Sequence, residues 1–255
     1  MRYRLSVLLG ILLLATGLAW GADGSLRGDF TLTAHELTTF FHVVLLVFWL
    51  GPEIAIMVAG HFAINTSLSA PQRAGAARLM QYYEIMPRVC MSLMLTVGGV
   101  LSEMVGLEHP WWQMAGIWLL GPVWLGLTLA AYFNAHRGAE NLAEKLERWL
   151  RIVMIVAVPV SVAWSVSTGR LEEAPYVGGK LILFALVLLL GLLARRAFGP
   201  FMAGVKQLAT TGASPAGDAS MVASFRSGRL YVYGVWAALL GAALMGIMKV
   251  GVPAA

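Results

Sequence analysis

Six ionisable residues lie in or at the edge of long apolar runs, where a helix embedded in lipid has no water to solvate a charge. They are His42, Glu53, His61, Glu84, Arg88 and Lys180. A charged side chain at the middle of a membrane helix costs roughly 2.5–3.5 kcal/mol on insertion scales. Such groups persist where they form ion pairs, bind a metal or cofactor, or carry protons. These positions therefore predict a chain that is more than a passive membrane anchor.

The histidines suggest two groups of candidate iron ligands. His42 lies one to two turns inside the end of its apolar run and is the histidine best placed to be buried. His61 and His136 follow His35 and His109 by twenty-six and twenty-seven residues, which places them level in two helices that run the same way. Haem b in a helical bundle is usually held by histidines at one depth on different helices. Simple hydrogen bonding of interfacial histidines is the competing interpretation.

The other buried charges have structural and functional interpretations. Glu84 and Arg88 are four residues apart and share a helix face, which favours an internal ion pair or a proton-carrying step. Glu53 follows a glycine-proline step and is expected to have no partner in its own helix, so it could carry a proton. Lys180 could extend outward to water, face the bundle near His42, or pair with a carboxylate.

Sulfur side chains recur along one helix face, at Met86, Cys90 and Met94. Thioether and thiolate ligands suit Cu(I), so this face is a candidate copper site. Methionine is also a good packing residue in apolar cores. Both interpretations stay open at this point. Cys90 is the single cysteine, which excludes an intramolecular disulfide.

Composition defines the fold class that must position these residues. Apolar residues make up 59% of the chain and charged residues 12%, against roughly 25% charged in soluble domains. We expect an all-α, polytopic membrane bundle of about seven spans, since a crossing helix needs ~20 apolar residues. The predicted spans are residues 5–20, 40–62, 82–101, 111–133, 150–166, 176–193 and 230–248.

The predicted domain organisation is simple. Residues 1–30 form either a retained anchor or a cleaved signal segment, in which case six spans remain. Residues 31–255 form a single transmembrane domain, and its small, polar stretch within 199–228 predicts a flexible cytoplasmic loop. A Leu-Gly-Pro triplet at 50–52 recurs at 120–122, which indicates repeated helical hairpins or coincidence.

Basic residues predict the orientation. Thirteen of the eighteen Lys and Arg residues fall on one side if the N-terminus is cytoplasmic, and three fall on the other. The positive-inside rule therefore predicts a multi-pass protein of the cytoplasmic (inner) membrane with its C-terminus outside. The net charge of +5 is spread over short loops, so it predicts lipid as the partner and no nucleic acid.

Several short motifs resemble a known superfamily. Residues 41–51, FHVVLLVFWLG, carry a histidine, a tryptophan seven positions later and a glycine soon after. This resembles the first conserved helix of the HemJ-type protoporphyrinogen oxidases, and residues 79–99 are similar to the second. Residues 168–196 resemble the helix pair of copper resistance protein D (CopD). The resemblance covers roughly residues 36–200.

The resemblance implies a haem-b membrane protein in which His42 and Lys180 match a functionally important histidine and lysine. The oxidases carry a Pro-Arg step where this chain has Pro52 followed by Glu53. The resemblance therefore indicates membership of the broad superfamily rather than either named activity.

The leading hypothesis is a haem-b-binding integral membrane protein with a redox or electron-transfer role, served by a redox partner protein. His42 would be the iron ligand, with His61 and His136 as a second site. The residues expected to anchor propionates or move protons are Lys180, Arg88, Glu53 and Glu84. The alternatives are a copper transport or copper-handling protein and a non-catalytic subunit of a larger membrane complex.

Overall fold

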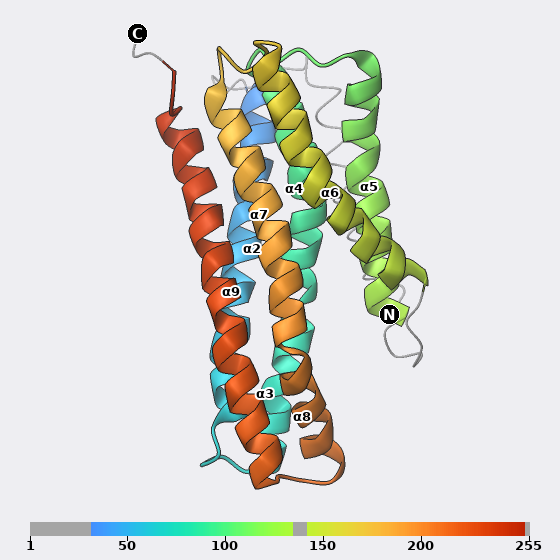
Figure 1. Cartoon of the computed structure of the whole chain (residues 1–255), viewed down its shortest axis with the longest axis vertical. Coiled ribbons are helices and arrows are strands. Elements are labelled where there is room, and N and C mark those ends of the chain that lie inside the picture. The colour runs from blue at the N-terminus through green and yellow to red at the C-terminus, as the bar shows by residue number, and fades with distance from the viewer. Residues whose placement is uncertain (1–31, 135–141, 253–255) are drawn as a thin grey trace.

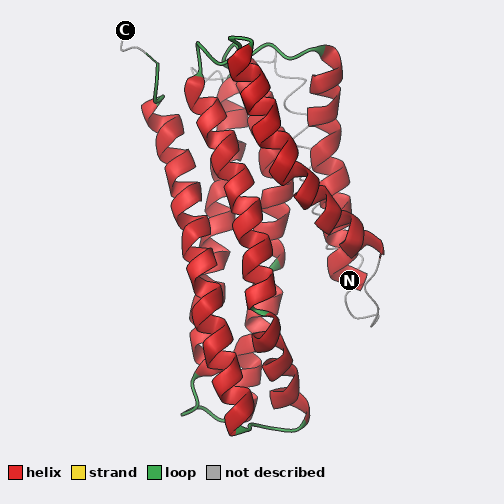
Figure 2. Cartoon of the chain, viewed as in Figure 1, coloured by secondary structure: helices red, strands yellow, loops and turns green. Residues whose placement is uncertain are grey.

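The structure, a computed structural model, describes residues 32–134 and 142–252, and in this part of the chain it is an all-α bundle (Figures 1 and 2). The helices are α2 (Ala34–Ile64), α3 (Ala70–Tyr83), α4 (Ile85–Met104), α5 (Trp111–Asn134), α6 (Leu142–Ser167), α7 (Pro175–Ala197), α8 (Gly199–Thr210) and α9 (Pro215–Met248). The predicted span at 5–20 lies outside the described residues.

Six helical segments of the described chain are long and apolar enough to cross a membrane. They contain the six predicted spans between residues 40 and 248, so the polytopic helical fold is confirmed. Consecutive spans pack against each other along the chain, in the pairs α2 with α4, α4 with α5, α5 with α6, α6 with α7, and α7 with α9. In addition, α9 packs back against α2, which closes one side of the bundle.

Prolines explain one interruption and leave other helices intact. The α3–α4 segment breaks at Glu84, three residues before Pro87. Proline lacks an N–H and its ring clashes with the carbonyl four residues earlier, so a break in the preceding turn is expected. Pro52, Pro122 and Pro159 lie inside α2, α5 and α6, which continue past them.

The segment 199–228, predicted to be a loop, is largely helical. Helix α8 and the first half of α9 occupy most of it, and only the turn between them, at 211–214, is non-helical. Ser224 accepts a hydrogen bond from the backbone N–H of Phe201 at 3.0 Å and donates to the carbonyl of Ala197 at 2.7 Å. Within the small polar stretch, Ser214 caps α9 by accepting a hydrogen bond from the N–H of Gly217, and serine is a favoured residue at a helix start.

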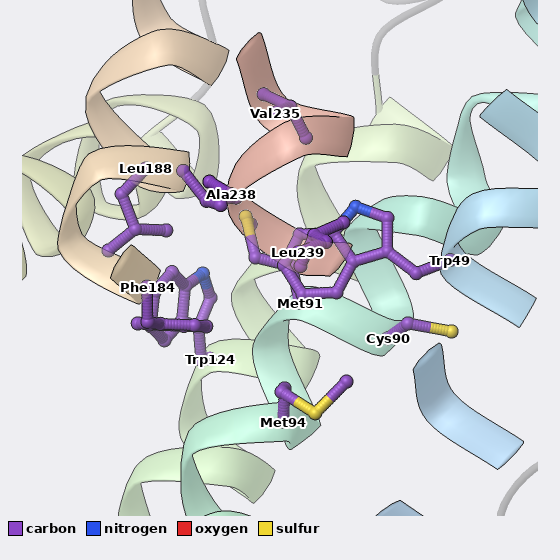
Figure 3. Packing of buried hydrophobic residues seen from close by; sticks show 11 residues of the cluster. Trp49, Cys90, Met91, Met94, Trp124, Phe184, Leu188, Val235, Ala238 and Leu239 are labelled. Atoms are coloured by element: carbon purple, nitrogen blue, oxygen red, sulfur yellow. The ribbon is translucent and has the colours of Figure 1, made fainter. Parts of the chain in front are cut away.

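Within the described residues, buried apolar side chains form three clusters between the helices. The central cluster contains the side chains of Trp49, Trp124 and Leu188, which are 2%, 0% and 1% exposed (Figure 3). A second cluster fills the end of the bundle where α3 and α8 lie, around Phe201 and Phe225. These two clusters fix the helices that carry the candidate functional residues.

The outer faces of the helices remain apolar. Only 17% to 44% of the most apolar stretch of each span is buried inside the bundle. Most of each stretch therefore faces outward, although it is apolar. Exposed α2 side chains include Val43, Val47, Ile54 and Val58. This surface is consistent with contact with a lipid bilayer, which solvates apolar side chains but not backbone polar groups.

Candidate functional site

His42 is a buried imidazole with a nitrogen that has no partner. Its Nδ1 is enclosed and makes no hydrogen bond within the described residues, and the same is true of Oγ1 of Thr39, three positions earlier on the same face of α2. A Cβ added to Gly98 of α4 would lie 3.3 Å from Cε1 of His42, so the absence of a side chain there lets α4 approach the ring. Buried polar atoms are normally paired, and two neighbouring unpaired atoms indicate a missing partner.

Lys180 faces the bundle close to His42. A Cβ added to Gly246 of α9 would lie 3.0 Å from Nζ of Lys180, which places the ammonium group against α9. The ammonium also interacts electrostatically with His42. No ion pair with Lys180 is found in the described part of the chain. Glu103, a carboxylate near the end of α4, has its Oε2 2.5 Å from Nδ1 of His109.

His61 makes local contacts at the other end of α2. Its Nδ1 lies 2.8 Å from the carbonyl oxygen of Met57, one turn earlier, and its ring packs edge-on against Phe225 with centroids 4.9 Å apart. Its predicted partner, His136, lies outside the described residues. The His61–His136 site therefore stays a prediction.

Glu53 joins two helices through hydrogen bonds from two tryptophans. Its Oε1 accepts from Nε1 of Trp49 at 3.0 Å, and its Oε2 accepts from Nε1 of Trp236 on α9 at 2.7 Å. The expectation that Glu53 has no partner in its own helix is wrong, because Trp49 precedes it by one turn. The i, i+4 spacing of these two residues was the sequence signal for this contact.

Glu84 and Arg88 form the ion pair that their spacing predicts. Both residues line a cavity of about 870 Å³, which all eight described helices border. Trp49 and Glu53 line the same cavity, whereas His42 and Lys180 do not. The candidate residues therefore divide into two places: a His42–Lys180 region and this charged cavity.

The sulfur face of α4 is mainly part of the core. Cys90 and Met94 are 3% and 8% exposed and lie in the central cluster with Trp49 (Figure 3). This packing supports the structural interpretation of the sulfur residues. Within the described residues, no group of three or more His, Cys, Asp or Glu side chains is arranged to hold a metal ion together.

Two functional candidates escaped prediction from the sequence. Arg151 and Arg195 line the cavity, but the sequence indicated them only as charges that orient the helices. Arg151 follows Glu147 by four residues and pairs with it, so an i, i+4 search could have found that contact. No local sequence pattern predicts that Arg195 on α7 pairs with Glu144 on α6.

Comparison with known proteins gives no match: no family model, curated protein or solved structure is similar enough to this chain to indicate a relationship. The fold and the site geometry therefore define the class as a polytopic, α-helical membrane protein with buried polar sites.

Proposed function

We propose that this chain is a haem-b-binding integral membrane protein with a redox role, in which His42 is the iron ligand. The observation that carries the proposal is the enclosed, unpartnered Nδ1 of His42 inside a membrane span. No group of the described residues pairs with this nitrogen, although buried polar atoms are normally paired. A metal-bound cofactor would give the imidazole a partner through its other ring nitrogen.

Two surrounding residues bear on this proposal. Gly98 lets the imidazole ring of His42 pack against the backbone of α4, which holds the ring in place. Lys180 provides a positive charge in electrostatic range of His42, and an ammonium group suits a propionate carboxylate. When bound, haem supplies a one-electron iron couple.

The protein's own residues would bind and tune such a group. His42 would hold the iron, and the identity of the protein ligand is a main determinant of haem potential. Lys180 would orient the ring through one carboxylate and keep that charge compensated in a low-dielectric environment. The apolar side chains of the spans would exclude water from the site.

The test is an absorption spectrum of the protein purified in detergent after expression with haem supplied. We expect a Soret band in the wild type, its loss in His42→Ala, and its retention in the control His35→Ala, which changes an exposed histidine of the same helix. Lys180→Met should fold and bind haem more weakly, because it keeps most of the stem but removes the charge. A wild type without a Soret band, or a folded His42→Ala protein with an unchanged band, would contradict the proposal.

A further inference from the structure

Three arginines from three helices contribute to the lining of the cavity. Arg88 of α4, Arg151 of α6 and Arg195 of α7 all line it, and Arg151 interacts electrostatically with both of the others. Like charges repel one another, most strongly where solvent is scarce, as at Arg151, which is buried. A cluster of this kind therefore needs negative charge nearby.

Each arginine has one carboxylate from the protein. Glu84 pairs with Arg88, Glu147 with Arg151, and Glu144 with Arg195. A fourth arginine, Arg78 of α3, also lines the cavity. The remaining carboxylate in the lining is Glu53, and both of its oxygens already accept hydrogen bonds from tryptophans.

The three arginines retain unused donors. A guanidinium has five N–H groups, and Arg88, Arg151 and Arg195 each donate one hydrogen bond to their glutamate. Arg151 is 6% exposed, and both its Nε and its Nη2 lie against the same oxygen of Glu147. The side chains of Arg88 and Arg195 also line the cavity and are 21% and 38% exposed, so they leave room for a further acceptor. An oxyanion in the cavity would accept hydrogen bonds from these donors.

The rest of the lining is largely apolar. It includes Trp49, Met57, Met91, Val187 and Val235, which belong to the two core clusters. Cavities of roughly 300–1,000 Å³ hold ligands of several hundred daltons, and this cavity of about 870 Å³ falls in that range. A ligand that fills it would need an anionic end and an apolar body.

We propose that the cavity binds an amphipathic anion, with a carboxylate or phosphate head at Arg88, Arg151 and Arg195 and its apolar body against Trp49, Met91 and Val235. Guanidinium groups recognise both kinds of oxyanion through paired N–H donors. The site is separate from His42, because Glu53 follows His42 by eleven positions in α2, which corresponds to about 16 Å along the helix. The proposal does not depend on haem binding.

Arg195 offers the sharpest charge test, because its neighbour is a matched control. Arg195→Gln removes a guanidinium from the cavity, whereas Arg196→Gln removes the same charge from the adjacent residue, which does not line it. Glu144 keeps Arg148 at 3.7 Å after Arg195 is replaced, so the fold should survive. We expect Arg195→Gln to weaken anion binding about tenfold, the equivalent of one charge-assisted hydrogen bond, and Arg196→Gln to change it less than twofold.

A second variant blocks the cavity without altering charge. Gly191 of α7 borders the cavity, and a Cβ added there would meet no atom within 4 Å. Gly191→Leu should fill part of the space, leave the melting temperature close to that of wild type and weaken binding at least tenfold. Gly51→Leu is the control, since Gly51 also faces open space but does not line the cavity.

Binding is measured with the full chain in a neutral detergent, with laurate, dodecyl phosphate and phosphatidylglycerol as probes and phosphatidylcholine as the uncharged-lipid comparison. Titration reports the two soluble anions, and native mass spectrometry reports retained lipid. Selective binding of the soluble anions indicates a free amphipathic ligand, and selective retention of phosphatidylglycerol indicates a lipid headgroup. The proposal is overturned if the wild type prefers no anion, or if Arg196→Gln weakens binding as much as Arg195→Gln.

Discussion

Nε1 of Trp236 on α9 lies 2.7 Å from Oε2 of Glu53 on α2, a hydrogen bond between residues 183 positions apart in sequence. The other oxygen of Glu53 accepts from Trp49 at 3.0 Å, so this carboxyl group joins the first and last described spans. Hydrogen bonds between spans hold helices together where lipid offers no hydrophobic driving force. The Glu53–Trp236 contact is thus a specific link that closes the bundle.

Glu53→Leu should destabilise the protein because it removes the acceptor of two indole N–H groups. We expect a loss of about 1–3 kcal/mol in the free energy of unfolding in detergent, the usual cost of an unsatisfied buried donor. Trp236→Phe should cost less when made in the Glu53→Leu background than in the wild type. Equal costs in both backgrounds would show that the two residues are not energetically coupled.

Gly60 should be intolerant of any side chain. A Cβ at this position of α2 would lie 2.2 Å from Cε2 of Phe225 on α9, a buried ring that cannot move easily. Gly60→Ala should therefore destabilise by roughly 1–3 kcal/mol, as overpacking does. Gly51→Ala in the same helix meets no atom within 4 Å and should be neutral or stabilising by up to about 1 kcal/mol. Thermal melting of both variants in one detergent decides between these outcomes, and equal melting temperatures would contradict the close approach.

Sequence periodicity and hydropathy were sufficient for the spans, because the ~20-residue apolar run is a direct physical requirement of crossing lipid. They failed at 199–228, where helicity depends on tertiary contacts such as the burial of Phe201 and Phe225. Single-sequence propensity cannot anticipate that burial, since it arises from packing between α8 and α9.

The site could be predicted only where its contacts are local. The Glu84–Arg88 pair follows from i, i+4 spacing. The sequence allowed several orientations of Lys180, and one of them was toward His42. The choice depends on how α7 is oriented about its own axis relative to α2. The convergence of Arg151 and Arg195 in one cavity depends on the mutual placement of α6 and α7, which no motif in the sequence encodes.

Arg73 on α3 should be essential for stability. It is 1% exposed, its Nε donates to the carbonyl oxygen of Ala63 at 2.9 Å, and its Nη2 donates to Asp218 of α9 at 2.7 Å. Arg73→Met should lower the free energy of unfolding by about 3–5 kcal/mol, because it leaves a partly buried carboxylate unpaired. Adding Asp218→Asn should recover part of that loss. Denaturant titration of the two variants tests this, and a double variant no more stable than Arg73→Met would argue against the ion pair as the cause.

Reporter fusions should distinguish the two ends of the bundle. The turn at 211–214 and the end of α9 lie at opposite ends of that helix (Figure 1). A reporter active only in the cytoplasm should give signal when inserted at Gly212 and none when fused to Ala255, as the basic residues predict. The reversed pattern would contradict the predicted orientation, and signal from both positions would contradict a membrane-spanning α9.

Cys90 should behave as a packing residue rather than a copper ligand. Its side chain is 3% exposed in the central cluster, beside Met91 and Trp49 (Figure 3). Cys90→Ala should cost on the order of 1 kcal/mol for the small cavity it leaves, and Cys90→Ser should cost more because its hydroxyl is buried among apolar groups. Cu(I) retained after dialysis against a weak chelator should be equal in the wild type and in both variants. A selective loss of bound copper in Cys90→Ala, with the fold intact by circular dichroism, would instead identify this face of α4 as a metal site.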